Sequence, residues 1–295
     1  MDWQKGRESD NVVEDDGSGG GGGFGGGGMR FGGFHLGIGG IIVVVLIGLI
    51  FPGVRPILFS LFLNGGGGVD TAEQSTPAPT HAATANDPQT KFVRSILGST
   101  EDVWGAYFQA SGHQYEQPKL VLFHGRTQSG CGAAEEAMGP FYCPNDHRVY
   151  LDLDFFHEMD TRFHAQGDFA RAYVVAHEVG HHVQNLLGIM QRVGGRPTEG
   201  ATGTSVRLEL QADCFAGVWG NKSQAQLNWL QAGDVDAALN AASSVGDDTL
   251  QKQSRGYAVP DSFTHGTSAQ RSRWFKAGFT SGDINSCDTF SATSL

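Results

Sequence analysis

An uninterrupted apolar run near the N-terminus constrains this chain more than any other feature of its sequence. Residues 34–54 contain no formally charged side chain, and a second apolar stretch, residues 56–63, follows Arg55. A helix needs roughly 20 predominantly apolar residues to cross the hydrocarbon core of a membrane. A buried helix of a soluble domain would show a polar stripe, and this run shows none. The sequence therefore predicts one transmembrane helix, with an apolar flank, within residues 34–63.

A cleaved signal peptide is the alternative interpretation of this run. Its apolar region begins close to the N-terminus, behind a basic segment, whereas an acidic and glycine-rich arm comes first here. A retained single span is therefore favoured. Arg30 and Arg55 flank the run on opposite sides, so the distribution of Lys and Arg does not fix its orientation. The cysteines and the position of the large domain favour a C-terminal part outside the cytoplasm.

The segments on both sides of the apolar run are not expected to fold. Residues 1–33 are polar and then almost pure glycine, a composition too poor in apolar surface to offset the entropy of ordering, so they are predicted to be disordered. Residues 64–89, rich in Gly, Thr, Ala and Pro, are typical of a flexible linker. This leaves residues 90–295 as one folded domain. The net charge of −11, without a Lys/Arg cluster, argues against a nucleic-acid partner.

The domain has few expected strands early and several expected helices later, which predicts an α+β fold that is mostly helical with a small sheet. Two short β-strands are expected, and the helix from Asp168, a good N-cap residue, carries the central motif described below. The expected strands are residues 119–123 and 148–153, and the expected helices are 91–109, 168–187, 204–219, one from 234, and 268–278.

Four cysteines, none of them in a Cys-x-x-Cys pair, argue against a zinc ribbon or a thioredoxin-type site. An even number suits two disulfides in an oxidising compartment. Cys131 and Cys143 are close in sequence with turn-forming residues between them, which favours that pair and leaves Cys214 with Cys287. Four reduced, buried thiols are the alternative.

The chemistry of the chain centres on His177-Glu178-Val179-Gly180-His181. Residues four apart lie on one face of a helix, so both histidines can offer nitrogens to one metal ion, and the intervening glutamate can reach a water on that ion. The alternative is a helix whose two histidines are simply packed or solvated.

Three features favour the metal site. The apolar residues 173–176 just before the motif indicate a buried helix, where imidazoles and a carboxylate are costly unless something satisfies them. On the next helix, Glu209 can complete the metal shell, while Asp213, four residues later, can accept the free N–H of a ligand histidine. Gly180 and Ala212 are small, which would let the two helices approach closely.

This arrangement resembles that of the gluzincins, the thermolysin-like metallopeptidases. More closely, the chain is similar to the putative neutral zinc metallopeptidase family of bacterial membrane-anchored proteins. The resemblance implies a zincin-like domain, Zn²⁺ held by His177, His181 and Glu209, and Glu178 as general base in the hydrolysis of a peptide or protein substrate. It also implies the bacterial inner membrane as location. The matching stretches are residues 139–144, 177–184, 209–214 and 264–266, together with the apolar run and the glycine-rich arm.

The developing oxyanion of such a reaction needs a donor besides the metal. His265 is the first candidate and Tyr257 the second. His182, His157 and His164 are interpreted as packing or surface residues. The strand at 119–123 is a hypothetical edge for pairing with an extended peptide.

Two other functions remain open. One is a zincin-like binding or scaffold domain without activity, against which the intact Glu178 speaks. The other is a zinc amidase acting on cell-wall material with the same ligands.

Overall fold

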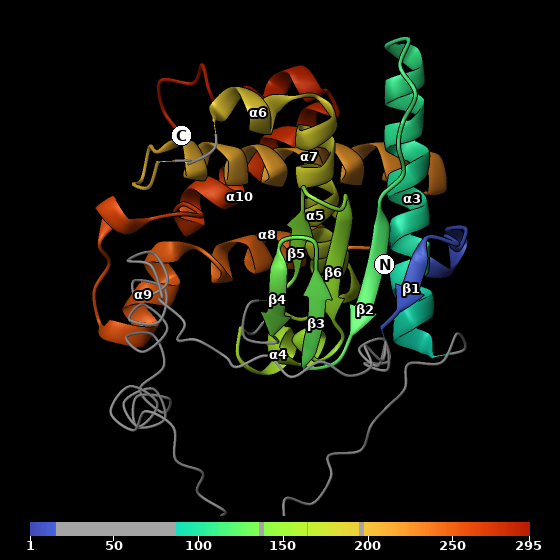
Figure 1. Ribbon diagram of the computed structural model, residues 1–295, viewed down its shortest axis with the longest axis horizontal. Helices are drawn as coiled ribbons and strands as arrows, with labels where there is room; N and C mark the ends of the chain where they lie inside the picture. Colours follow the sequence, from blue (N-terminus) through green and yellow to red (C-terminus); the bar gives the residue numbers. More distant parts are fainter. Residues whose placement is uncertain (16–86, 136–138, 164, 195–197) are drawn as a thin grey trace, which may run out of the picture. The chain divides into compact units, whose positions relative to one another are not determined.

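Helix α5, Asp168–Leu186, lies at the centre of the fold (Figure 1), where it contacts helices α3, α7 and α8 and strands β5 and β6. The computed structural model describes residues 1–15, 87–135, 139–163, 165–194 and 198–295, all within one compact unit. The predicted transmembrane segment, residues 34–63, lies outside the described residues. Among those that are described, no helix is both long and apolar enough to cross a bilayer.

A four-stranded sheet lies against α5 and α3, in the order β1-β2-β6-β5. The strands are β1 (Val12–Glu14), β2 (Lys119–Phe123), β6 (Arg148–Asp152) and β5 (Phe141–Cys143); β1, β2 and β6 are parallel and β5 is antiparallel to β6. Alternate side chains such as Leu120, Leu122 and Leu151 join the main core, as the two-residue period of a strand requires.

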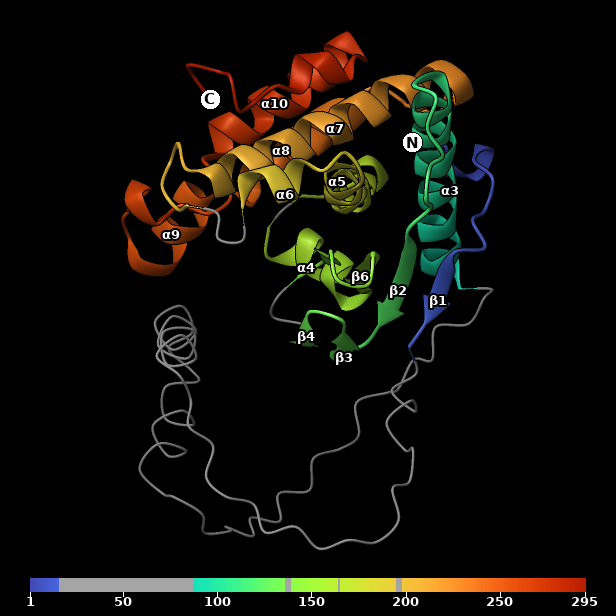
Figure 2. The same ribbon diagram turned by 45° about the horizontal axis from the view of Figure 1, so that its top comes forward.

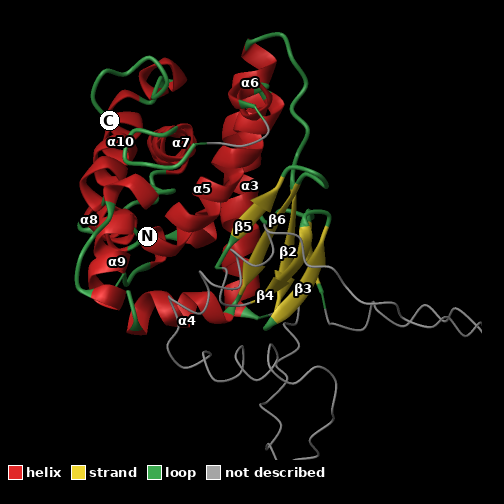
Figure 3. Ribbon diagram, turned by 60° about the vertical axis from the view of Figure 1, so that its left-hand side comes forward, coloured by secondary structure: helices red, strands yellow, loops and turns green. Residues whose placement is uncertain are grey.

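The other face of the sheet carries a smaller buried cluster that includes Val121, Phe123 and Tyr150. A hairpin of β3 (Arg126–Ser129) and β4 (Gly132–Glu135) lies on this side, away from α5 (Figures 2 and 3). The disulfide Cys131–Cys143 joins the turn of the hairpin to β5. The predicted pairing of peptides along residues 119–123 is wrong, because β2 already pairs with β1 on one side and β6 on the other.

The helices form a layer of their own in which glycines permit close contact. A Cβ atom on Gly180 of α5 would lie 3.1 Å from the carbonyl oxygen of Ala212 on α7, which confirms the predicted close approach. Glycines also bring α7 and α10 together, and the predicted disulfide Cys214–Cys287 ties α7 to the C-terminal segment. The helices are α3 (Pro88–Ala110), α4 (Asp154–Thr161), α6 (Ile189–Val193), α7 (Thr204–Leu227), α8 (Asp234–Ser244), α9 (Asp247–Arg255) and α10 (Ser268–Ser281).

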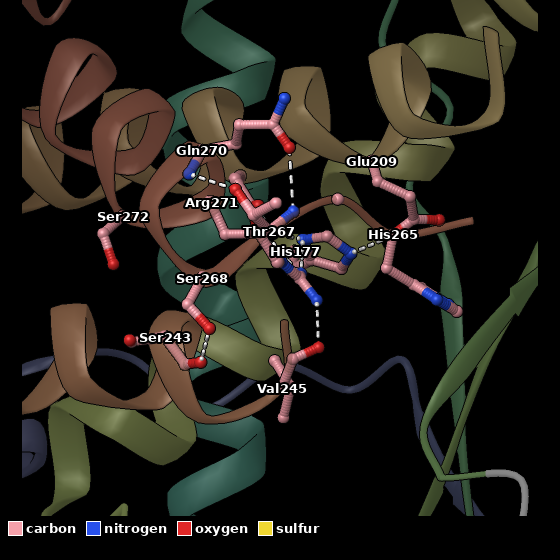
Figure 4. Close-up of polar contacts among 12 residues, drawn as sticks. His177, Glu209, Ser243, Val245, His265, Thr267, Ser268, Gln270, Arg271 and Ser272 are labelled. Atoms are coloured by element: carbon pink, nitrogen blue, oxygen red, sulfur yellow. Dashed lines mark hydrogen bonds and ion pairs between the residues drawn. The ribbon is translucent and has the colours of Figure 1, made fainter. Parts of the chain in front are cut away.

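The helix-rich α+β prediction is confirmed, with differences in detail. Helix α7 continues to Leu227, eight residues beyond its predicted end, because Gly220 lies inside the helix and packs against Phe169 and Phe279 instead of capping it. Asp168 is the first residue of α5 rather than its cap, which is Gly167. Thr267 forms a capping box with Gln270 at the start of α10 (Figure 4).

The N-terminal residues are a correction to the predicted disorder of residues 1–33. Residues 1–15 carry a 3-10 turn, Trp3–Lys5, and strand β1, and they pack on α3 and β2. The glycine run begins only at Gly17, so the average composition of residues 1–33 conceals a short segment with Trp3 and Val12 to bury. The domain therefore includes residues 1–15, and its first long helix begins at Pro88 inside the predicted linker.

Candidate metal centre

Two histidines of α5 and one glutamate of α7 converge on a single point. The Nε2 atom of His177 lies 3.2 Å from one carboxylate oxygen of Glu209, and the Nε2 atom of His181 lies 3.5 Å from the other. One possible ligand atom from each residue lies within 4.8 Å of the other two. Figure 4 shows the contact between His177 and Glu209. Two imidazoles and a carboxylate form a donor set that fits zinc.

The opposite nitrogen of each imidazole has its own partner. The Nδ1 atom of His177 lies 2.9 Å from Asp213, and the Nδ1 atom of His181 lies 2.9 Å from the side-chain oxygen of Gln184. Both partners accept hydrogen bonds, so each Nδ1 carries the proton and each Nε2 is left to face Glu209. The Gln184 amide is itself held, because its nitrogen donates to the carbonyl of Leu208. Each ring is therefore held with its Nε2 atom towards Glu209.

Asp213, fully buried, is the centre of a charged network. Arg271 of α10 donates to both of its oxygens at 2.9 Å, and the Tyr173 hydroxyl donates to one of them at 2.5 Å. Burial alone would raise the pKa of Asp213, but Arg271 and His177 outweigh it and lower the pKa to about 2. Asp213 is therefore an anion throughout the ordinary pH range.

The charged groups of the cluster shift one another's pKa values. Burial would lower the pKa of His177, but the carboxylates of Asp213 and Glu209 outweigh it and raise the pKa to about 10. The pKa of Glu209 is held well below its usual value by His181, His265 and His177, against the effect of its own burial. For Glu178 burial dominates and raises the pKa, which brings this carboxylate closer to the range in which it can exchange a proton near neutral pH.

His265 lies in a loop beside the same centre (Figure 4). Asp247, the first residue of α9, accepts hydrogen bonds from the backbone N–H groups of Thr264, His265 and Gly266, which fixes the loop. The Nδ1 atom of His265 lies 2.8 Å from the Thr264 hydroxyl and 3.4 Å from Asp247. Burial would lower the pKa of His265, but Glu209 and Asp247 outweigh it and raise the pKa. The half-exposed ring is thus an oriented donor next to Glu209.

The remaining sequence candidates lie away from this chemistry. Tyr257 is 62% exposed and stacks with Arg255. His182 is fully buried between Tyr142 and the carbonyl of Glu116, as expected of a packing residue. His157 lies on α4 rather than in a loop, because the loop predicted there folds into a helix that buries Phe155, Phe156 and Met159. His164 lies outside the described residues.

Several residues of the site were not identified from the sequence. Gln184 follows His181 by three positions, so helical spacing alone was a usable signal. Tyr173 precedes His177 by four positions and carried the same signal. Arg271 and Asp247 come from helices far along the chain, and no local pattern connects them to the motif.

The sequence matches one family model and several bacterial proteins. A model of the family described as "Putative neutral zinc metallopeptidase" matches residues 1–290. The chain is 48% identical over 304 aligned residues to "Uncharacterized protein YpfJ" of Escherichia coli (strain K12), covering 98% of this chain and 99% of that protein. It is 44% identical over 215 residues to "Uncharacterized protein Rv2575" of Mycobacterium tuberculosis, covering 70% and 73% respectively. No solved structure matches the chain.

Proposed function

The chain belongs to the putative neutral zinc metallopeptidase family, and on that premise we propose that it hydrolyses peptide bonds with a zinc ion held by His177, His181 and Glu209. The observation that carries this proposal is the convergence of those three side chains within 4.8 Å, with each imidazole oriented by a partner on its far nitrogen. Packing alone does not require two histidines to face one carboxylate through the same ring nitrogen. A metal ion at that point satisfies all three groups.

Zinc bound there would supply a water of lowered pKa and a Lewis acid for the substrate carbonyl. Glu178 would act as the general base that takes a proton from the attacking water and as the general acid that passes it to the leaving amine. Its position next to His177 on α5, only 7% exposed, keeps bulk water from competing for the proton. The raised pKa of Glu178 fits both halves of this task.

His265 is proposed to stabilise the negative charge that develops on the substrate oxygen. Its Nδ1 faces Thr264 and Asp247, which leaves Nε2 to donate to a bound substrate. An extended peptide is proposed to pair with β5, an edge strand of the described sheet that contacts α5.

Location outside the cytoplasm of a bacterium is part of the proposal. Both cysteine pairs are bonded, and disulfides persist mainly in oxidising compartments. Residues 34–63 are proposed to attach the protein to the inner membrane, because their length and apolar character suit lipid.

The test uses the full-length chain with Glu178→Gln, and with Glu158→Gln on the surface of α4 as a matched control. Bound zinc and the hydrolysis of casein are measured for each. We expect near one zinc per chain in all three proteins and a loss of cleavage of about 10²-fold or more for Glu178→Gln alone, the usual size of an acid–base contribution. Absence of zinc from the unmutated protein would contradict the assigned ligands.

Peptidoglycan fragments are assayed in parallel with casein. Cleavage of these fragments but not of casein would replace the peptidase with a wall amidase. Zinc without any hydrolysis by the unmutated protein would support a binding domain instead.

A further inference from the structure

The N-terminal arm, residues 1–15, is built into the same unit as residues 87–295. Strand β1 pairs in parallel with β2 over three residues, and the pairing is extended by hydrogen bonds between Leu120 N–H and the Asn11 carbonyl and between Asp15 N–H and the Leu122 carbonyl. Ahead of β1, Ser9 N–H donates to the carbonyl of Arg94 on α3. The arm therefore provides one edge of the central sheet.

A buried carboxylate on α3 holds the arm in place. Glu101 is 3% exposed, and its two oxygens accept hydrogen bonds from Ser9 at 2.6 Å, Asn11 at 2.7 Å and Arg7 at 2.7 Å. All three donors belong to the arm. Without the arm, the side chain of Glu101 would lose these three contacts, so the fold of the domain and the position of the arm depend on each other.

The apolar run, residues 34–54, stands between the arm and the rest of the domain in the sequence. A single crossing of a membrane by this run would place residues 1–15 and 87–295 on opposite sides, where β1 and β2 cannot pair. We infer that the arm and the metallopeptidase domain lie on the same side of the membrane, and that the chain is attached to one face of a lipid bilayer rather than threaded through it once. The single span predicted from the sequence is incompatible with the pairing of β1 and β2.

The length of the apolar sequence decides between the remaining arrangements. Two full crossings need about 40 predominantly apolar residues, more than residues 34–63 contain, and Arg55 interrupts them. Attachment from one face needs no such length. The end of β1 and the start of α3 lie at the same end of the domain (Figures 1 and 2). The partner is therefore the lipid surface on the side of the domain.

The experiment asks which side of the membrane each segment occupies. A single cysteine is added to the full-length chain at Asp10 in the arm, or at Gln253 on α9, both exposed. The four native cysteines are bonded to one another and do not react. Each variant is treated with a membrane-impermeant maleimide in intact spheroplasts and in inverted membrane vesicles, with detergent-permeabilised samples to define full reaction.

We expect Asp10→Cys and Gln253→Cys to react in the same preparation and to be protected in the other. Reaction of the two in opposite preparations would overturn the inference and establish a single span. Neither result depends on peptidase activity, so a failure of the proposed function and a failure of this topology are distinguished.

Discussion

At the scale of residues, Asp213 links the candidate metal centre to three helices. Its carboxylate contacts His177 and Tyr173 on α5 and Arg271 on α10 from its own position on α7. Replacement by asparagine keeps the shape but removes the charge that orients the imidazole. We expect Asp213→Asn to weaken zinc binding by about 10- to 100-fold, the usual effect of losing the partner of a ligand histidine.

This affinity is measured by competition with a chromophoric zinc chelator. Asp236→Asn, on α8, is the control and should bind zinc as the unmutated protein does. Equal affinity in the Asp213 and Asp236 variants would show that Asp213 is a packing residue only.

The sequence was informative about this centre only where the residues share a helix or follow a helical spacing. His177, Glu178 and His181 were predicted from five consecutive positions, and Glu209 with Asp213 from the next long helix. The structure brings His177, His181, Glu209 and Asp213 together. Arg271 lies 58 positions after Asp213, and its contact depends on how α7 and α10 pack, which no local pattern encodes.

At the scale of elements, the packing of α7 against α10 depends on glycine. A Cβ atom at Gly278 would overlap the carbonyl oxygen of Cys214, which belongs to the backbone of α7 and cannot move aside. We expect Gly278→Ala to lower the free energy of unfolding by about 3 kcal/mol or more, as overpacking does.

Gly105→Ala on α3 is the matched control, because a Cβ there meets no atom within 4 Å. It should stabilise the protein by about 0.5–1 kcal/mol. Urea unfolding of both variants checks the pair, and a stable Gly278→Ala protein would contradict the close contact between the two helices.

His182 makes the contact between α5 and the sheet dependent on pH. Burial lowers the pKa of His182 to about 4, whereas a histidine in the unfolded chain titrates near ~6.5. The unfolded state therefore binds more protons than the folded state between these two pH values. The stabilisation that comes from keeping His182 neutral is fully present above about pH 6.5 and is lost as the pH falls towards 4. This shift of the pKa corresponds to a change of about 3 kcal/mol at most in the free energy of unfolding.

Urea midpoints of the metal-free protein between about pH 4 and 7.5 measure this dependence. We expect His182→Gln to be less stable at the upper end of this range but to have a flatter slope below about pH 6.5. His157→Gln, at an exposed position on α4, should leave the slope of the unmutated protein unchanged. A slope that His182→Gln does not flatten would assign the acid sensitivity to other groups.

The long helices were predictable because their apolar period extends over several turns, as in α3 and α5. Strands β1, β3, β4 and β5 were missed for the opposite reason. Each has only three or four residues, too few for an alternation to stand out, and their formation depends on partners elsewhere in the chain.

At the scale of the whole molecule, the N-terminal arm is the part that composition misrepresented. The glycines from Gly17 onward dominate the average composition of residues 1–33. Trp3 packs edge-on against Phe92, and Ser9 is fully buried. A short polar segment folds only where another part of the chain offers groups for it to pair with. Here these groups are the edge of β2 and the carboxylate of Glu101.

That dependence predicts the behaviour of a chain that begins at residue 87. It exposes the edge of β2 and leaves Glu101 without its three donors, and a hydrogen bond to a charged group contributes about 1.5–3 kcal/mol. We expect its free energy of unfolding to fall by at least about 3 kcal/mol relative to the full-length chain. A synthetic peptide of residues 1–15, added in trans, should restore stability in proportion to the logarithm of its concentration, because it binds only the folded state. The same peptide with Ser9→Ala and Asn11→Ala is the control and should restore much less, since it keeps β1 but loses two contacts to Glu101. Urea midpoints at several peptide concentrations provide the measurement. Full stability of residues 87–295 without any peptide would mean that the arm is an accessory, and the constraint it places on the membrane topology would then lose its physical basis.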